Sequence, residues 1–170
     1  MMKSKEMAAY ALLGLRLTNK MSRTELARKT MYNNITLARI EKGESAPTLE
    51  VLQAYAKAFN MTTSKIVEKT EDEQFAILGK RLYDTYRKMN NSANFCMKQK
   101  DYIIAAAKRK GYRSFTKAML SLGMGERSPW NFKRAYNDGR SNISAMRDYV
   151  LYQFVKGFNM KYDEKEGFWK

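Results

Sequence analysis

The sequence predicts an all-α protein. The 170 residues include two prolines, Pro47 and Pro129, and no stretch alternates apolar and polar residues with the period of two that strands show. Apolar residues recur instead at helical spacing, and 44% of all residues are hydrophobic, which is enough to build real cores. We therefore expect short helices packed into one or two small domains.

Five short helices are expected in the first part of the chain. Their approximate ranges are 7–20, 22–30, 33–42, 48–59 and 63–71. Ser22, Asn33 and Thr48 stand at the start of three of them, where a side-chain oxygen can accept a hydrogen bond from a free backbone N–H of the first turn. Gly43 and Asn60 follow two of them and can adopt the left-handed conformation that ends a helix.

The second and third of these helices have the spacing of a helix-turn-helix. The inward side chains of the first helix of the pair are Leu26 and Ala27, and a short break at 31–32 separates it from a helix anchored by Leu37 and Ile40. Two short helices locked at a steep angle leave the outer face of the second one free to enter the major groove of DNA. This segment is therefore expected to read a DNA sequence.

From Leu15 to about Val67 the chain resembles, without a gap, the phage-repressor (Cro/cI, XRE) helix-turn-helix family. The residues of the family pattern that it keeps are Ser22, Leu26-Ala27, Arg39-Ile40-Glu41, Gly43 and Pro47. It departs at Arg23, where the family usually has Gln, and at Met31, where the turn usually has Gly; Met tolerates a positive φ poorly. The resemblance implies a five-helix, repressor-type domain that binds double-stranded DNA, commonly as a homodimer on inverted repeats.

The resemblance also assigns DNA contacts to the third helix and its surroundings. The base-reading candidates are Asn34, Ile35 and Arg39. These residue types suit the task because Asn pairs with adenine, Arg pairs with guanine, and Ile packs on a thymine methyl group. The candidates for phosphate contacts are Arg23, Asn33 and Lys42. Arg39 has two alternatives: an ion pair within the chain, with Glu41 or Glu25, or a phosphate contact.

A polar, acidic stretch at 69–74 marks the expected boundary between two domains, 1–72 and 73–170. The first domain carries 12 basic and 8 acidic side chains, a net charge of +4, and the second carries 20 basic and 9 acidic, a net charge of +11. Most of the surplus therefore lies outside the helix-turn-helix. Such a surplus is typical of proteins that bind a polyanion, because each neutralised phosphate releases condensed counterions.

Parts of the second half repeat parts of the first. Segment 12–17 (Leu-Leu-Gly-Leu-Arg-Leu) recurs as 77–82 (Ile-Leu-Gly-Lys-Arg-Leu), and segment 57–61 (Lys-Ala-Phe-Asn-Met) recurs as 156–160 (Lys-Gly-Phe-Asn-Met). Short matches of this kind also arise by chance in a helical chain rich in Lys, Leu and Asn. The order of the matched features nevertheless favours a duplicated module.

The residues between the repeated segments suggest a second reading helix. Ser128 and Pro129 predict the start of a helix over 129–138, and an apolar stripe at helical spacing follows over 143–158. One interpretation is a second, diverged helix-turn-helix whose DNA-facing residues are Asn131, Lys133, Arg134 and Asn137. The other interpretation is an unrelated helical domain for oligomerisation or for binding a protein partner.

Two further features of the second half each have two interpretations. The basic run 108–110, at the end of a helix expected over 101–110, is either a phosphate clamp or a solvated helix end, where cations favour the helix dipole. The aromatic residues Trp130, Phe132 and Tyr136 either stack on unpaired bases, as in RNA-binding proteins, or belong to the core.

Composition and motifs argue against several classes of protein. With one cysteine, Cys96, and no histidine, the chain has no internal disulfide and no zinc site of the usual ligand types, and we expect Cys96 to be a packed thiol. No stretch is long and apolar enough to span a membrane, and the sequence has no phosphate loop, nucleophile motif or carboxylate cluster. We therefore expect a cytoplasmic protein without a cofactor, a metal or an enzymatic activity.

Together these features favour a sequence-specific transcriptional regulator that binds double-stranded DNA, a repressor of the phage or mobile-element type. A first alternative is a phage-encoded inhibitor or adaptor, for example one like an anti-CRISPR protein, that binds a protein or ribonucleoprotein through 73–170. A second alternative is an RNA-binding protein that uses its basic, aromatic second half.

Overall fold

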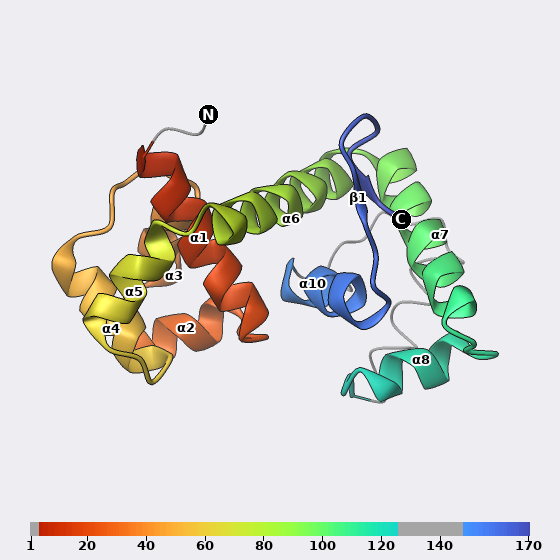
Figure 1. Cartoon of the computed structure of the whole chain (residues 1–170), viewed down its shortest axis with the longest axis horizontal. Helices are drawn as coiled ribbons and strands as arrows, with labels where there is room; N and C mark the ends of the chain where they lie inside the picture. The colour runs from red at the N-terminus through yellow and green to blue at the C-terminus, as the bar shows by residue number, and fades with distance from the viewer. Residues whose placement is uncertain (1–3, 126–147) are drawn as a thin grey trace. The chain divides into compact units, whose positions relative to one another are not determined.

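The computed structural model describes residues 4–125 and 148–170 of the chain (Figure 1). Nearly all regular structure in these ranges is helical, which confirms the expected all-α class, and the described strands are a pair of two residues each near the C-terminus. The chain divides into two compact units between Arg81 and Leu82. None of the described helices is long and apolar enough to cross a lipid bilayer.

The first unit contains five short helices around one core. Their bounds are α1 Ser4–Thr18, α2 Arg23–Thr30, α3 Asn34–Glu41, α4 Leu49–Ala58 and α5 Thr63–Thr70. Each helix contributes a fully buried side chain to this core, namely Leu12, Leu26, Leu37, Tyr55 and Ile66. The five helices expected from the sequence are confirmed, although the first begins at Ser4 rather than at residue 7.

Side-chain caps fix where four of these helices begin. Ser22, Asn33, Thr48 and Thr62 each accept a hydrogen bond from the backbone N–H three residues further on, at 3.1, 2.7, 3.4 and 3.2 Å. Each cap satisfies one of the free N–H groups of a first turn and stabilises its helix by about 1 kcal/mol. Three of these caps, all but Thr62, are the ones that the sequence predicts.

Helix α6 (Glu73–Asn91) begins in the first unit and crosses α1 at a pair of glycines. A Cβ on Gly79 would collide with the carbonyl oxygen of Tyr10, and a Cβ on Gly14 would lie 2.7 Å from the carbonyl oxygen of Phe75. The two backbones can approach this closely because neither glycine has a side chain. The first pair of repeated segments thus supplies matching glycines to one helix crossing. This crossing attaches the start of α6 to α1, and residues up to Arg81 belong to the first compact unit.

The second unit packs its C-terminal strands on a long helix. Its elements after α6 are α7 Ala93–Arg109, α8 Phe115–Ser121, α10 Asp148–Gly157, β1 Tyr162–Asp163 and β2 Phe168–Trp169. The strands pair antiparallel, with Tyr162 opposite Trp169. The Gln99 side chain on α7 donates to the carbonyl oxygen of Trp169 at 2.8 Å and accepts from its N–H at 3.0 Å. The rings of Phe95 and Phe168 stack with their centroids 4.0 Å apart.

Helix α7 also buries two reactive side chains one turn apart. Cys96 is fully buried, as expected of a packed thiol, and burial raises its pKa. Lys100 is 1% exposed, and burial lowers the pKa of its ammonium group. The helix expected over 101–110 is therefore the C-terminal part of a longer one that begins at Ala93.

The second pair of repeated segments forms the same kind of helix ending. Asn60 after α4 and Asn159 after α10 have φ values of 54° and 52°. In both places the N–H of the following methionine donates to the carbonyl oxygen five residues back, at 2.8 and 2.9 Å. This is the Schellman ending, in which a left-handed residue lets the chain satisfy a free carbonyl. The shared sequence therefore encodes a shared local structure.

Candidate nucleic-acid interface

Helices α2 and α3 and the turn between them form the helix-turn-helix that the sequence predicts (Figure 1). Leu26 on α2 and Leu37 and Ile40 on α3 are at most 2% exposed, and Ala27 is half-buried. These are the side chains expected on the inward faces. Their burial leaves the opposite side of α3 on the surface of the unit.

Met31 occupies the turn in the left-handed conformation. Its φ is 61° and its side chain is 90% exposed. The Thr30 hydroxyl steadies the turn, because it donates to the carbonyl oxygen of Leu26 at 2.8 Å and accepts from the N–H of Tyr32 at 3.4 Å. The turn thus keeps a geometry that suits Gly, at a cost of roughly 1–2 kcal/mol for a residue with a side chain.

The three base-reading candidates all lie on the exposed side of α3. Asn34 is exposed, Ile35 is 73% exposed and the Arg39 side chain is 61% exposed. An isoleucine this exposed forgoes most of the roughly 1.5–3 kcal/mol that burial would contribute. Contact with a thymine methyl group would restore part of it, while the amide and the guanidinium match the polar edges of adenine and guanine.

The three phosphate candidates are held in different ways. The Lys42 side chain is 43% exposed. Asn33 is exposed, and its Oδ1 caps α3, so its amide NH2 is the group that could donate to a phosphate. The Arg23 side chain is 32% exposed, and its Nε lies 3.0 Å from Oε2 of Glu41. Arg23 and Asn33 also stand at the starts of α2 and α3, where free N–H groups attract anions.

Glu44, just past α3, contacts two cations of this surface. Its carboxylate oxygens lie 4.0 Å from Nε of Arg39 and 3.8 Å from Nζ of Lys42. The intrachain partner of Arg39 is thus Glu44, and not Glu41 or Glu25, the two that the sequence suggested. Both pairs are exposed and contribute at most about 1 kcal/mol each, so DNA can displace the carboxylate at little cost.

A buried ion pair fixes the C-terminal end of α3 to α1. Arg16 and Glu41 are 0% and 1% exposed; the guanidinium Nε lies 2.6 Å from Oε1, and NH2 lies 3.0 Å from Oε2. A third nitrogen of Arg16 donates to the carbonyl oxygen of Met21 at 3.0 Å. The Glu41 carboxylate also affects Tyr55 on α4. The pKa of Tyr55 is raised well above its ordinary value, mainly because the side chain is buried and secondly because Glu41 is negatively charged.

This ion pair was not among the contacts predicted from the sequence, although the sequence carries a signal for it. Arg16 interrupts the apolar run 12–17, and a charge that a helix carries into the core requires a partner of opposite sign. Glu41 follows the buried Ile40 and is the acidic residue of the family pattern. The pair links the C-terminal end of α3, the helix that carries the base-reading candidates, to α1.

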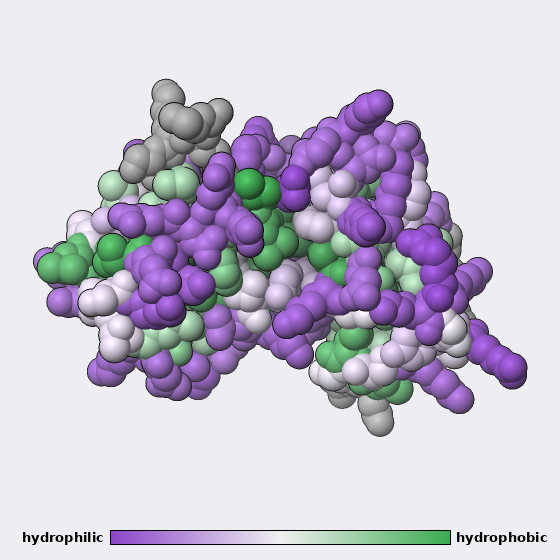
Figure 2. All heavy atoms as spheres, viewed as in Figure 1, coloured by the Kyte–Doolittle hydropathy of each residue, from purple (hydrophilic) through white to green (hydrophobic). Residues whose placement is uncertain are grey.

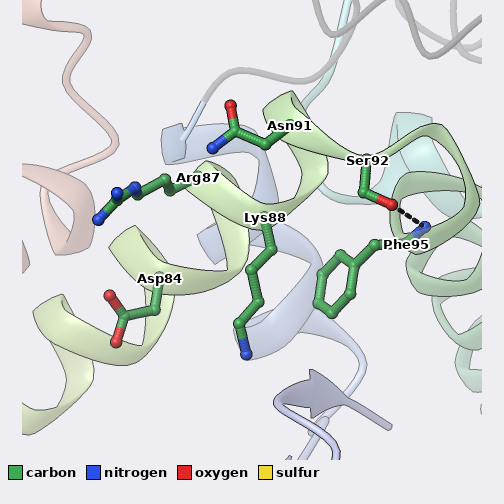
Figure 3. A pocket seen from close by; sticks show the side chains of 6 residues that line it. All are labelled: Asp84, Arg87, Lys88, Asn91, Ser92 and Phe95. Carbon is green, nitrogen blue, oxygen red and sulfur yellow. Dashed lines mark hydrogen bonds between the residues drawn. The ribbon is translucent and has the colours of Figure 1, made fainter.

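The second unit has a surface pocket of about 340 Å³ where α6 meets α7 (Figure 3). Its lining residues are Asp84, Arg87, Lys88, Asn91, Ser92 and Phe95. The side chains of Arg87, Lys88 and Asn91 point in different directions, and the Ser92 hydroxyl caps α7 by accepting from the N–H of Phe95 at 3.2 Å. These groups do not converge on a common point. Within 4–125 and 148–170, no group of three or more His, Cys, Asp or Glu side chains could hold a metal ion.

The proposed second reading helix lies outside the described residues. This applies to 129–138 with its four candidates Asn131, Lys133, Arg134 and Asn137, and to the start of the stripe over 143–158. Of the described part of that stripe, Phe154 and Phe158 are buried and Val150 is half-buried.

A family model described as helix-turn-helix matches residues 14–66. The match contains α2 and α3 whole and confirms the resemblance for this segment, so a helix-turn-helix domain is present at the N-terminus. It supports a DNA-binding helix-turn-helix regulator. No curated protein and no solved structure gives a significant match to the chain.

Proposed function

We propose that the protein is a sequence-specific regulator of transcription, a repressor of the phage or mobile-element type, that places α3 in the major groove of double-stranded DNA. The observation that carries this proposal is that one face of α3 is exposed while the rest of the helix is packed against its domain. An amide, an aliphatic group and a guanidinium project into solvent from a helix whose other side is buried and whose end is held by the Arg16–Glu41 pair.

The residues of this surface would make two kinds of contact with DNA, one to base edges and one to phosphates. Asn34, Ile35 and Arg39 contact base edges and so select the sequence, whereas Lys42 and the helix starts contact phosphates and so set the register. Occupation of an operator would then exclude RNA polymerase. As the resemblance implies, two copies of the chain would bind two half-sites, about 10 base pairs apart from centre to centre.

Selection from a pool of random duplexes with the full chain tests this proposal. We expect one enriched motif, and an inverted repeat in that motif supports the dimer. The variant with Asn34→Ala and Arg39→Ala should enrich no motif or a shorter one. Lys57→Ala, which removes an exposed cation from α4, serves as the control and should enrich the wild-type motif. Equal recovery of every sequence by the wild-type chain would contradict the proposal.

A further inference from the structure

Two segments of the second unit, around the ends of α7, α8 and α10, carry exposed cations and no Asp or Glu of their own. Segments 102–125 and 149–162 contain seven basic residues and no Asp or Glu. These residues, all exposed, are Lys108, Arg109, Lys110, Arg113, Lys117, Lys156 and Lys161. We call them the basic corner. Five of the seven lie in the last turn of α7, the first turn of α8 or the turn between these helices, and Figure 2 shows hydrophilic side chains projecting there.

Apolar contacts between the three helix ends hold the basic corner in place. The ring of Tyr112, in the turn after α7, lies 6.1 Å from that of Phe158, just after α10, and its hydroxyl lies 2.8 Å from the hydroxyl of Ser121 on α8. A Cβ on Gly157 would collide with the side chain of Leu122. The ends of α7, α8 and α10 therefore form one packed surface, and its cations are displayed on a fixed backbone.

Helix dipoles account for only some of these cations. Lys108, Arg109 and Lys156 stand in the last turns of α7 and α10, where a positive charge is favoured. Lys117 stands in the first turn of α8, where a positive charge is disfavoured, and Arg113 precedes the cap of that helix. None of the seven forms an ion pair with a described residue. Like charges gathered in this way repel one another, so an anionic partner would stabilise them.

The surroundings of the basic corner favour a phosphate backbone over other anionic partners. Stable attachment to a membrane surface usually needs apolar groups as well as cations, and the described residues there offer one exposed large apolar side chain, Leu120. An acidic protein is bound mainly through aromatic anchors, and Tyr112 is half-buried and engaged with Ser121. Regularly spaced phosphates need only exposed cations, which is what this surface provides.

We propose that the basic corner is a second DNA-binding surface, which holds the phosphate backbone of double-stranded DNA without reading its sequence. The choice of DNA as the partner rests on the proposed function of the first unit. The chain would then contact DNA in two ways, with α3 supplying specificity and the basic corner supplying affinity that depends on salt. This division would explain why most of the positive charge lies outside the helix-turn-helix.

The test compares two full-length variants that lose the same net charge. The corner variant carries Lys108→Gln, Arg109→Gln, Arg113→Gln and Lys117→Gln. Lys110 is kept because its Nζ lies 3.0 Å from the side-chain amide group of Asn159. The charge control removes four exposed cations elsewhere, with Lys57→Gln, Lys65→Gln, Arg87→Gln and Lys165→Gln. Affinity for a labelled duplex of arbitrary sequence is measured between about 50 and 200 mM salt.

For the wild-type chain, log affinity should fall linearly with log salt, by about 0.9 per phosphate contact. In the corner variant the magnitude of this slope should be smaller than in the wild type by about 2–4, and affinity at the lowest salt should fall at least tenfold. The slope of the charge control should differ from that of the wild type by no more than about 1. Equal changes in both variants would mean a general effect of net charge and would overturn the proposal, as would an unchanged slope in the corner variant. Loss of binding to single-stranded RNA or to anionic vesicles, with duplex binding intact, would also overturn it.

Two further measurements separate this proposal from that for α3. On the motif selected by the wild-type chain, the corner variant should keep its preference over arbitrary DNA, whereas Asn34→Ala with Arg39→Ala should lose the preference and keep the salt slope. If the corner variant does not fold, as judged by its circular dichroism, the pair Arg113→Gln and Lys117→Gln replaces it, with an expected slope loss of about 2.

Discussion

Replacing Arg16 with Met would leave the Glu41 carboxylate buried with one ion-pair partner, Arg23, in place of two. Removing one member of a buried ion pair typically costs roughly 3–5 kcal/mol. Arg23 keeps its contact at 3.0 Å, which places the expected loss near the lower end, about 3 kcal/mol. If Glu41→Leu is added, no uncompensated charge stays buried. The free energy of unfolding of the double variant should then lie within about 2 kcal/mol of that of the wild type, because apolar side chains replace the buried pair and the remaining loss is the partly exposed pair of Glu41 with Arg23.

Urea unfolding of four proteins, namely the wild type, Arg16→Met, Glu41→Leu and the double variant, measures the coupling free energy between Arg16 and Glu41. Circular dichroism follows both units, whereas the two tryptophans, Trp130 and Trp169, both lie in the second half. With a slope of about 1 kcal/mol per molar urea, Arg16→Met should lower the midpoint of the first unit by about 3 M and leave the fluorescence transition unchanged. A loss below about 1 kcal/mol, or a double variant that loses the sum of the two single variants, would refute this account of the pair.

Three further changes test other parts of the fold. Gly79→Ala should destabilise the first unit by roughly 1–3 kcal/mol in the same urea assay, because its Cβ meets the α1 backbone, whereas Gly125→Ala, which has open space, should stay within about 0.5 kcal/mol. Met31→Gly should stabilise that unit by about 0.5–1 kcal/mol, because Gly adopts the left-handed backbone conformation of this turn more readily than Met and the exposed Met31 side chain buries almost nothing. A loss of stability would contradict the claim that Met31 is strained in this conformation. The hydrogen bond from Lys170 lowers the pKa of Asp163 to about 2, so this carboxylate should stabilise the C-terminal strands above pH 4 and less as the pH falls towards 2. In thermal unfolding followed by tryptophan fluorescence, Asp163→Asn should lose less stability than the wild type between about pH 4 and pH 2. The same pH dependence in both proteins would contradict a stabilising role for the Asp163 carboxylate.

Sequence patterns predicted the parts of the fold that are determined locally. The five helices, three of their caps and the inward faces of α2 and α3 follow from side-chain types at fixed offsets. A cap contacts a residue three positions away, and an inward face is set by helical periodicity. For the same reason the closing position at Asn60 was predicted, and the residue matched to it, Asn159, ends its helix in the same way.

Contacts between distant segments were not predicted, because no local pattern encodes them. The repeat around Gly14 and Gly79 suggested a duplicated module, yet what it produces within the first unit is one close crossing. The pair between Arg16 and Glu41 joins residues 25 positions apart. The placement of Glu44 beside Arg39 depends on how the chain leaves α3, which helical periodicity does not describe.

Single base-pair substitutions in the selected DNA site, titrated with Arg39→Ala and Lys42→Ala, test most directly whether α3 reads the sequence. The two variants are matched, because both residues contact Glu44 and both substitutions remove one exposed cation near the same helix end. Arg39→Ala should cost roughly 1–3 kcal/mol on the best site and abolish the preference at one base pair. Lys42→Ala should weaken binding to all sites about equally. If Arg39→Ala also weakens all sites equally and leaves every base preference intact, Arg39 does not read a base and the central claim for α3 is contradicted.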